Sequence, residues 1–124
     1  MAENIIVTTG IYDLLKEQIR RKRVTKEVED RLTEELKYAQ QVLRRELPDD
    51  VVTVNRRVRI KDLNQNKEET YQFVSTGKQK IKKGKYSIMC DMGMATVGYR
   101  AGETITWPFP DGERQIKILS VEPL

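Results

Sequence analysis

The chain has 124 residues, of which 38% are apolar, and its 23 Lys and Arg outnumber its 19 Asp and Glu to give a formal net charge of +4. This length suits one modest globular core with a small appendage. No apolar run approaches the roughly 20 residues of a membrane span, and the first residues lack the basic and apolar regions of a secretory leader. We therefore expect a soluble, cytoplasmic protein.

The residue types that are missing exclude several kinds of chemistry. The chain contains no histidine, and Cys90 is its single cysteine. An internal disulfide and a Ser-His or Cys-His nucleophile are therefore excluded, and a zinc site nearly so. We expect no enzymatic activity, no metal and no cofactor, and nothing in the sequence demands more than a monomer.

The positive charge lies in the second part of the chain. Residues 1–50 carry 10 Lys and Arg against 11 Asp and Glu, whereas residues 51–124 carry 13 against 8, a net charge of +5. Such a field favours acidic partners, either nucleic acid or an acidic protein surface. The composition leaves open the alternative that the charge serves solubility alone.

Two amphipathic helices are predicted in the first part of the chain. Thr8-Thr9 can cap the first helix, which runs to Lys22, and Thr25 can cap the second, which we expect to continue to about Glu46. Because the link between them is short, the helices must be antiparallel neighbours. The apolar stripes of the two helices consist of Ile11, Leu14, Leu15 and Ile19, and of Val28, Leu32, Leu36, Ala39 and Leu43 in nearly heptad spacing.

Residues 1–47 are thus predicted to form an antiparallel helical hairpin, a short coiled-coil arm, followed by a linker at 47–50. The preceding run Asn4 to Val7 fits either an edge strand or packing beneath the first helix, and the sequence leaves this choice open. The tip of the arm is basic. Its residues are Arg20, Arg21, Lys22 and Arg23, followed by Glu27 in the first turn of the second helix.

From Val51 onward, apolar and polar residues alternate, as in strands with one buried face. A short helix is expected to open at Asp91 as its N-cap, and Pro110-Asp111-Gly112 forms a hairpin turn. Residues 51–124 are therefore predicted to be an α+β domain, an antiparallel sheet of five or six strands with one short helix. The predicted strands are Val51 to Val54, Val58 to Leu63, Thr70 to Val74, Tyr86 to Cys90, Thr104 to Trp107 and Arg114 to Val121.

Three segments of this domain carry a resemblance. They are VVTVNRRVRIKDL at 51–63, YSIMCDMGMATVGYRAGETITWPFPDGE at 86–113 and IKILSVE at 116–122. Within the second segment, a pattern of one hydrophobic residue, three glycines, an alanine and an acid comprises Met92, Gly93, Ala95, Gly98, Gly102 and Glu103. Together they resemble the C-terminal domain of the Gre transcription elongation factor family, GreA and GreB, and more closely its short-armed Rnk group, the regulators of nucleoside diphosphate kinase.

The resemblance implies an FKBP-like fold for residues 51–124, with a coiled coil before it. It also implies that the protein binds bacterial RNA polymerase, with the globular domain on the rim of the secondary channel and the arm pointing inward. Gre cleavage factors carry two acidic residues at the tip of a longer arm, where carboxylate oxygens help to hold a catalytic Mg²⁺.

In this chain the corresponding tip, residues 20–26, is cationic, and the arm is short. We therefore expect a transcription elongation regulator that acts at the secondary channel without stimulating transcript cleavage and that competes there with other channel-binding factors. Stimulation of nascent RNA cleavage is the alternative.

The resemblance also suggests where the polymerase is contacted. The family contact is expected at the end of the strand before the short helix, and at Asp91 the relatives usually have proline. The contact residues predicted there are Met89, Asp91, Met92 and Met94. The competing interpretation is that Met89 and Met94 belong to the core and that Asp91 merely caps the helix.

Two further functions are weighed from the residues. Lysines of the loop from Gly77 to Lys85 can neutralise nucleic-acid phosphates, although no interleaved aromatic side chain could stack on bases. These lysines are Lys78, Lys80, Lys82, Lys83 and Lys85. An FKBP-like prolyl isomerase would need converging aromatic side chains, and the sequence gives no sign that they converge. The available ones are Tyr71, Phe73, Tyr86, Tyr99, Trp107 and Phe109.

Overall fold

The structure is a computed structural model that describes residues 4–124. Its chain divides into two units, one that ends at Leu47 and one that begins at Pro48. The first three residues of the predicted arm, 1–3, lie outside the described residues. No helix among the residues described is long and apolar enough to cross a membrane.

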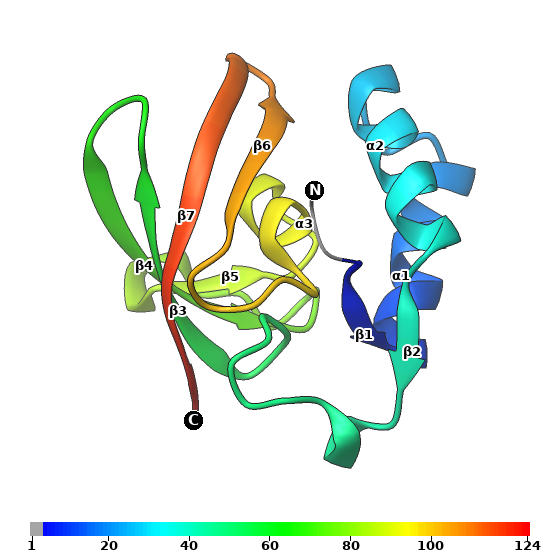
Figure 1. Cartoon of the computed structure of the whole chain (residues 1–124), viewed down its shortest axis with the longest axis horizontal. Coiled ribbons are helices and arrows are strands. Elements are labelled where there is room, and N and C mark those ends of the chain that lie inside the picture. The colour runs from blue at the N-terminus through cyan, green and yellow to red at the C-terminus, as the bar shows by residue number, and fades with distance from the viewer. Residues whose placement is uncertain (1–3) are drawn as a thin grey trace. The chain divides into compact units, whose positions relative to one another are not determined.

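The first unit is a helical hairpin flanked by two short strands (Figure 1). Its elements are β1 (Ile6–Thr8), α1 (Thr9–Arg20), α2 (Lys26–Lys37), β2 (Gln40–Val42) and a 3-10 turn, η1 (Arg44–Glu46). Strands β1 and β2 pair in parallel, residue for residue over three positions. This two-stranded ladder joins the chain that enters α1 to the chain that leaves α2.

Both helices of the hairpin begin where the sequence predicts. The Thr8 hydroxyl accepts a hydrogen bond from the Ile11 N–H, and the Thr25 hydroxyl accepts one from the Val28 N–H, each over 3.3 Å. Each bond satisfies one of the free N–H groups of a first helical turn. The apolar stripes are buried at Ile11 and Leu15 in α1 and at Val28, Leu32 and Leu36 in α2.

The predicted end of the second helix is wrong. Helix α2 ends at Lys37 rather than near Glu46, so Ala39 and Leu43 do not continue its apolar stripe. The residues that follow pair with β1 instead, and the Gln40 N–H donates to the Ile5 carbonyl over 2.9 Å. A backbone ladder to β1 thus replaces the helical hydrogen bonds, because tertiary pairing overrides a weak helical preference. The same ladder settles the open choice for the chain before α1 in favour of a strand.

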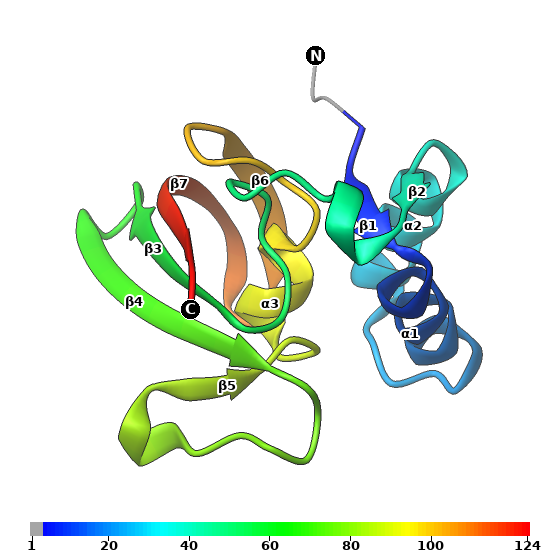
Figure 2. The same ribbon diagram turned by 90° about the horizontal axis from the view of Figure 1, so that it is seen from below.

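The second unit contains a curved five-stranded sheet with α3 against one face (Figure 2). The strand order is β5-β4-β3-β7-β6, antiparallel except that β4 and β5 are parallel. This arrangement confirms the predicted α+β class. The elements are β3 (Arg56–Asp62), β4 (Lys67–Val74), the 3-10 turn η2 (Ile81–Lys83), β5 (Lys85–Ser87), α3 (Asp91–Thr96), β6 (Thr104–Phe109) and β7 (Gly112–Pro123).

Strict alternation places the core of this sheet. In β3, Val58 and Ile60 are fully buried, whereas Arg57 and Arg59 are exposed on the opposite face. The same alternation buries Trp107 of β6 and the inward residues of β7. Because successive strand side chains point to opposite faces, the period of two in the sequence fixes which face meets α3.

One predicted strand is absent and another is shorter than predicted. Val51 to Val54 is not a strand, because its single ladder contact is an isolated bridge between Val51 and Arg100. The strand predicted at Tyr86 to Cys90 is β5, which ends at Ser87 and pairs with β4 over three residues. The chain after Ser87 turns toward α3, so the apolar residues there are buried by packing rather than by ladder pairing.

The N-cap of helix α3 lies one residue before the predicted cap, Asp91. The cap is Cys90, whose extended backbone precedes the helix and whose Sγ accepts from the Gly93 N–H over 3.3 Å. Asp91 is the first helical residue, where its carboxylate favours the positive end of the helix dipole. Sulfur is an uncommon capping acceptor, and an acid beside it explains why Asp91 looked like the cap.

Candidate functional site

Close packing of α3 on the segment before it depends on Gly93. A Cβ added at this position would lie 2.1 Å from the Ile88 carbonyl oxygen and 2.7 Å from its carbonyl carbon. Both obstacles are backbone atoms, so they cannot rotate away as a side chain could. Only glycine therefore fits at position 93. Ala95, two residues later, is fully buried.

The other glycines of the motif shape the turn from α3 into β6. Gly98 and Gly102 have φ of 86° and 93°, the left-handed region that glycine adopts without strain. Within the turn, the Glu103 carboxylate accepts from the Arg100 N–H over 2.6 Å. The Gly102 N–H then donates to the Ile118 carbonyl over 2.7 Å, which brings the chain into the sheet beside β7. The backbone conformation of this turn therefore explains why these motif positions hold glycine and an acid.

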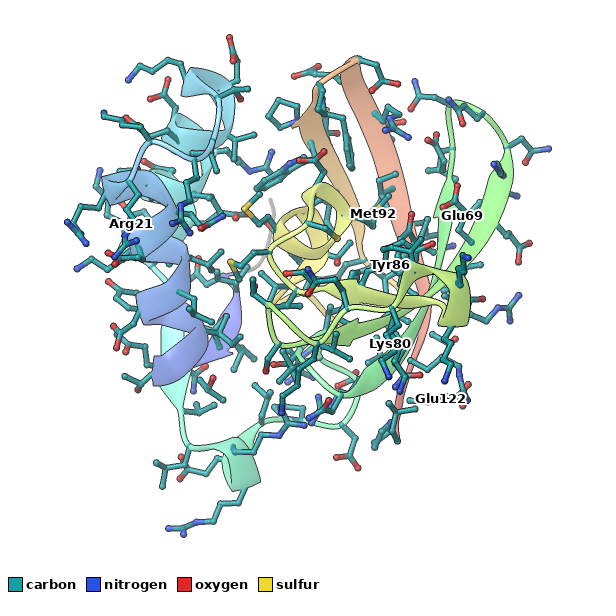
Figure 3. The ribbon with its side chains drawn as sticks, turned by 180° about the vertical axis from the view of Figure 1, so that it is seen from behind. Arg21, Glu69, Lys80, Tyr86, Met92 and Glu122 are labelled. Carbon is teal, nitrogen blue, oxygen red and sulfur yellow. The ribbon has the colours of Figure 1, made fainter. Side chains whose placement is uncertain are left out.

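The four residues predicted to contact the polymerase divide into two pairs. Met92 and Met94 are 7% and 5% exposed, so their side chains belong to the interior. Asp91 is exposed at the start of α3, and Met89 is half-buried beside it. The accessible part of the predicted contact is therefore Asp91 with Met89. Met92, labelled in Figure 3, accepts a hydrogen bond from the Thr96 hydroxyl through its carbonyl.

At the tip of the hairpin, acidic and basic side chains are paired along α1. Glu17 Oε1 lies 2.7 Å from Arg20 Nε, and its other oxygen lies 3.0 Å from Arg21 Nε. Hydrogen bonding from Arg20 lowers the pKa of Glu17, and the same bond raises the pKa of Arg20. Figure 3 labels Arg21 in this cluster.

The same pairing occurs at the start of α2. Lys26 Nζ lies 2.9 Å from Asp30 Oδ1 and 3.7 Å from Glu29 Oε2, and Lys22 Nζ lies 3.4 Å from Glu29 Oε1. The hydrogen bond to Asp30 raises the pKa of Lys26. These pairs were not identified from the sequence, although Lys26 lies three and four residues before Glu29 and Asp30, spacings at which helical side chains meet.

Two predicted tip residues differ from this pattern. Arg23 and Glu27 are both exposed, and neither forms an ion pair within residues 4–124. No group of three or more His, Cys, Asp and Glu side chains in the described part of the chain could hold a metal ion. The tip thus offers one carboxylate without a cationic partner, Glu27.

The lysine loop is held in shape by its backbone. Lys80 and Lys85 exchange two hydrogen bonds of 2.8 and 3.1 Å across the turn η2, and Gly84 closes that turn with φ of 74°. Lys78, Lys80, Lys82 and Lys83 are exposed, and Lys85 is half-buried. None of the five has an acidic partner among the described residues.

Some of the aromatic residues do converge. The ring of Tyr71 stacks on Phe73 with centroids 5.4 Å apart and meets Tyr86 at 4.8 Å. The Tyr71 hydroxyl donates to Glu69 over 2.6 Å, and burial followed by this bond raises the Tyr71 pKa. Figure 3 labels Glu69 and Tyr86 of this group. Each of the three rings packs against another ring of the cluster. We therefore interpret the cluster as part of the packing of the sheet domain.

An ion pair that sequence reasoning missed lies at the turn between β3 and β4. Asp62 Oδ2 accepts from Arg114 Nη1 over 2.9 Å, while Oδ1 accepts from the N–H groups of Asn64 and Gln65. Burial alone would raise the pKa of Asp62, but these hydrogen bonds outweigh it and leave the pKa lowered. An aspartate two residues before Asn64 is a signal for this kind of turn.

The amino-acid sequence is similar to those of a known protein family. The family model described as "Transcription elongation factor, GreA/GreB, C-term" matches residues 47–123. The chain is 32% identical over 96 residues to the regulator of nucleoside diphosphate kinase of Escherichia coli K12, covering 77% of this chain and 71% of that protein. It is 33% identical over 75 residues to the transcription elongation factor GreA of Acidiphilium cryptum, covering 60% of this chain and 48% of that factor.

Solved structures agree. The chain is similar to a GreA/GreB transcription elongation factor from Nitrosomonas europaea, with a TM-score of 0.68, 26% identity and coverage of 98% and 99% of the two chains. The transcription factor Gfh1 shares the fold at a TM-score of 0.52 and 20% identity, with the same coverage. The chain belongs to the GreA/GreB transcription elongation factor family.

Proposed function

We propose that this protein binds bacterial RNA polymerase at the secondary channel and regulates elongation without stimulating cleavage of the transcript. As a polymerase factor it would be non-enzymatic and would act in the cytoplasm, as a monomer. The observation that carries the second half of the proposal is the pairing of the tip acids, Glu17, Glu29 and Asp30, with neighbouring cations.

The chemistry of Mg²⁺ explains why this pairing matters. A hard divalent cation needs anionic oxygens with free lone pairs, and it is repelled by nearby ammonium and guanidinium groups. Asp30 lies 2.9 Å from Lys26 Nζ, and both oxygens of Glu17 face arginine side chains. Before any of these carboxylates could hold a metal, its own partner would have to leave.

Glu27 is the remaining acid of the tip, and it stands alone. It is exposed in the first turn of α2. The pair of acids that the family resemblance implies for cleavage factors would require a second free carboxylate beside it.

The reach of the hairpin supports the same conclusion. Helices α1 and α2 have 12 residues each, so at 1.5 Å per residue each spans about 18 Å. The resemblance implies a longer arm in the factors that deliver carboxylates to the catalytic metal. A short arm can occupy the channel without completing the metal site, because most of its tip acids are already paired with cations.

The proposed contact on the polymerase is the accessible pair at the start of α3. Asp91 is exposed and Met89 half-buried, so a charge with an apolar neighbour is available to a partner surface. The buried Met92 and Met94 would then act indirectly, by fixing how α3 is held.

Binding and cleavage are tested on one sample. The full chain is titrated onto purified core RNA polymerase, and nascent RNA cleavage is then followed in a backtracked complex, with and without an added GreA. We expect binding, no cleavage by the chain alone, and loss of the cleavage stimulated by GreA as the chain is added. The variant Asp91→Lys should weaken binding at least tenfold. Asp111→Lys, the same reversal at an exposed turn where it breaks the ion pair with Arg114, should not.

Each other outcome refutes a named part of the proposal. Cleavage stimulated by the chain would show that Glu27 or a paired acid reaches the metal and would establish the alternative function. Absence of binding would refute the polymerase assignment. Equal effects of the Asp91 and Asp111 variants would refute the contact at α3.

A further inference from the structure

The positive charge of the second unit has a single location. Residues 51–124 carry 13 Lys and Arg against 8 Asp and Glu, and five of those cations are the lysines of the loop. Without the loop lysines, residues 51–124 carry eight cations against eight anions, and Asp49 and Asp50 at the start of the unit add two more acids. From residue 70 to residue 90 the chain contains these five lysines and no acid. The net field of the unit is thus the field of one loop.

Three of the cations elsewhere in the unit are neutralised by acidic partners. Arg59 lies 2.7 Å from Glu68, Lys67 lies 3.7 Å from Glu69, and Arg114 pairs with both Asp62 and Asp111. The loop lysines have no such partner among the residues described. An unpaired cation keeps its attraction for an external anion, whereas a paired one must first lose its partner.

The backbone of the lysine loop is held by hydrogen bonds. Two Lys80–Lys85 backbone hydrogen bonds close the turn, and the Gln72 N–H donates to the Gly84 carbonyl, which ties the turn to the adjoining strand β4. The loop lies at β5, the edge strand of the sheet (Figure 2), with Lys80 labelled in Figure 3. The backbone that carries the five lysines is therefore tied to one edge of the sheet.

We propose that this lysine loop binds the phosphate backbone of duplex DNA, without sequence preference. Lysine is a compact point charge with flexible donors, suited to phosphate oxygens rather than to base edges. Duplex DNA presents about one charge per 1.7 Å of helix axis, about twice the density of one of its strands. This DNA binding is separate from the proposed binding to polymerase, because it can be measured with the chain and DNA alone.

The aromatic residues near the loop argue for a duplex over a single strand. Single-strand binders stack bases on exposed aromatic faces. Residues 75–85 contain no aromatic residue, and the nearest ring, Tyr86, is half-buried against Tyr71 with centroids 4.8 Å apart. With no free ring to receive a base, the loop gains more from phosphate density than from unpaired bases.

The test uses a fluorescein-labelled 20-base-pair DNA duplex and the full chain, with anisotropy measured from 25 to about 200 mM NaCl. Because each neutralised phosphate contributes about −0.9 to the slope of log K against log salt, four or five contacts predict a slope near −4. A variant in which Lys78, Lys80, Lys82 and Lys83 are each replaced by Gln should bind at least tenfold more weakly at the lowest salt, with a slope nearer −1.

A matched control removes the same number of charges elsewhere. Gln replaces Arg57, Lys61, Lys67 and Lys117, which lie on strands of the same unit. Thermal melting checks that both variants fold. Affinity of this control within about threefold of the original chain is expected.

Four results would overturn the proposal. They are absence of DNA binding by the original chain, an equal loss in the control variant, equally tight binding of a single strand of the same length, and displacement of the duplex by poly-glutamate at an equal charge concentration. The last result would show instead that the loop takes an acidic protein surface. None of these measurements involves polymerase, so they succeed or fail independently of the proposed function.

Discussion

Replacing Gly93 with Ala tests the account of how α3 is fixed to the sheet domain. The new Cβ would meet the Ile88 carbonyl oxygen at 2.1 Å, so the backbone must retreat by about 1.3 Å to restore an ordinary contact of 3.4 Å. Overpacking of this kind costs about 1–3 kcal/mol and sometimes more. The higher helix propensity of Ala recovers at most ~1 kcal/mol. We expect a net loss of about 2 kcal/mol in the free energy of unfolding.

The loss can be read from the single tryptophan. Trp107 is 1% exposed in the core of the same unit, so its fluorescence reports unfolding of the sheet domain. For a domain of this size, 1 kcal/mol shifts the melting temperature by about 4–8 °C, so a decrease of roughly 10 °C is expected.

The matched control for this change is Gly10→Ala in α1. A Cβ at Gly10 would meet nothing within 4 Å, so this variant should be neutral or gain roughly 0.5 kcal/mol. Far-UV circular dichroism follows its melting. A Gly93→Ala protein that melts within 1 °C of the original chain would refute the close packing of α3.

Further predictions concern the hairpin, the linker and the turn between β3 and β4. Thr25→Ala removes the cap of α2 and should cost about 1 kcal/mol in urea unfolding, whereas Thr25→Ser should not. Arg56 donates to the carbonyls of Pro48 and Val51 over 2.6 Å each. Arg56→Lys should therefore lower the free energy of unfolding by about 1–3 kcal/mol, whereas Arg57→Lys, on the exposed face, should leave it unchanged. Asp62→Asn should cost about 1–3 kcal/mol at pH 7 by weakening the pair with Arg114. The folded pKa of Asp62 lies below its ordinary value of 3.8, so this contribution is complete above pH 3.8 and is lost as the pH falls through the lowered pKa. The difference in stability between variant and original should therefore shrink as the pH is lowered below 3.8, and a difference that stays constant there would contradict the ion-pair explanation.

Local signals in the sequence were sufficient where one interaction decides the structure. The hydroxyls of Thr8 and Thr25 mark both helix starts, because a capping bond involves residues only three positions apart. The alternation around Val58 and Ile60 fixes which face of β3 is buried. The glycine pattern around Gly93 was recognised as a family feature, and the structure supplies its cause in the close approach to the Ile88 carbonyl.

Sequence reasoning failed where a distant partner decides. Nothing within residues 37–43 announces that Gln40 to Val42 will pair with Ile6 to Thr8, because the partner strand lies more than thirty residues earlier. Continuation of the heptad to Leu43 therefore looked sound and was wrong. Burial of Met92 and Met94 was likewise left open, because a short run of apolar residues has no period from which to read a face.

The two basic clusters of the chain show why counting charges does not locate a binding surface. At the hairpin tip, Glu17, Glu29 and Asp30 lie within 4 Å of the cations, so the local field is largely cancelled. In the lysine loop no acid is present from residue 70 to residue 90. At ordinary salt the Debye length is about 10 Å, so each cluster acts on partners by its local balance rather than by the net +4 of the chain. Salt should therefore weaken any contact made by the loop much more steeply than one made by the tip, and the salt series on the lysine-loop variant measures the share that belongs to the loop.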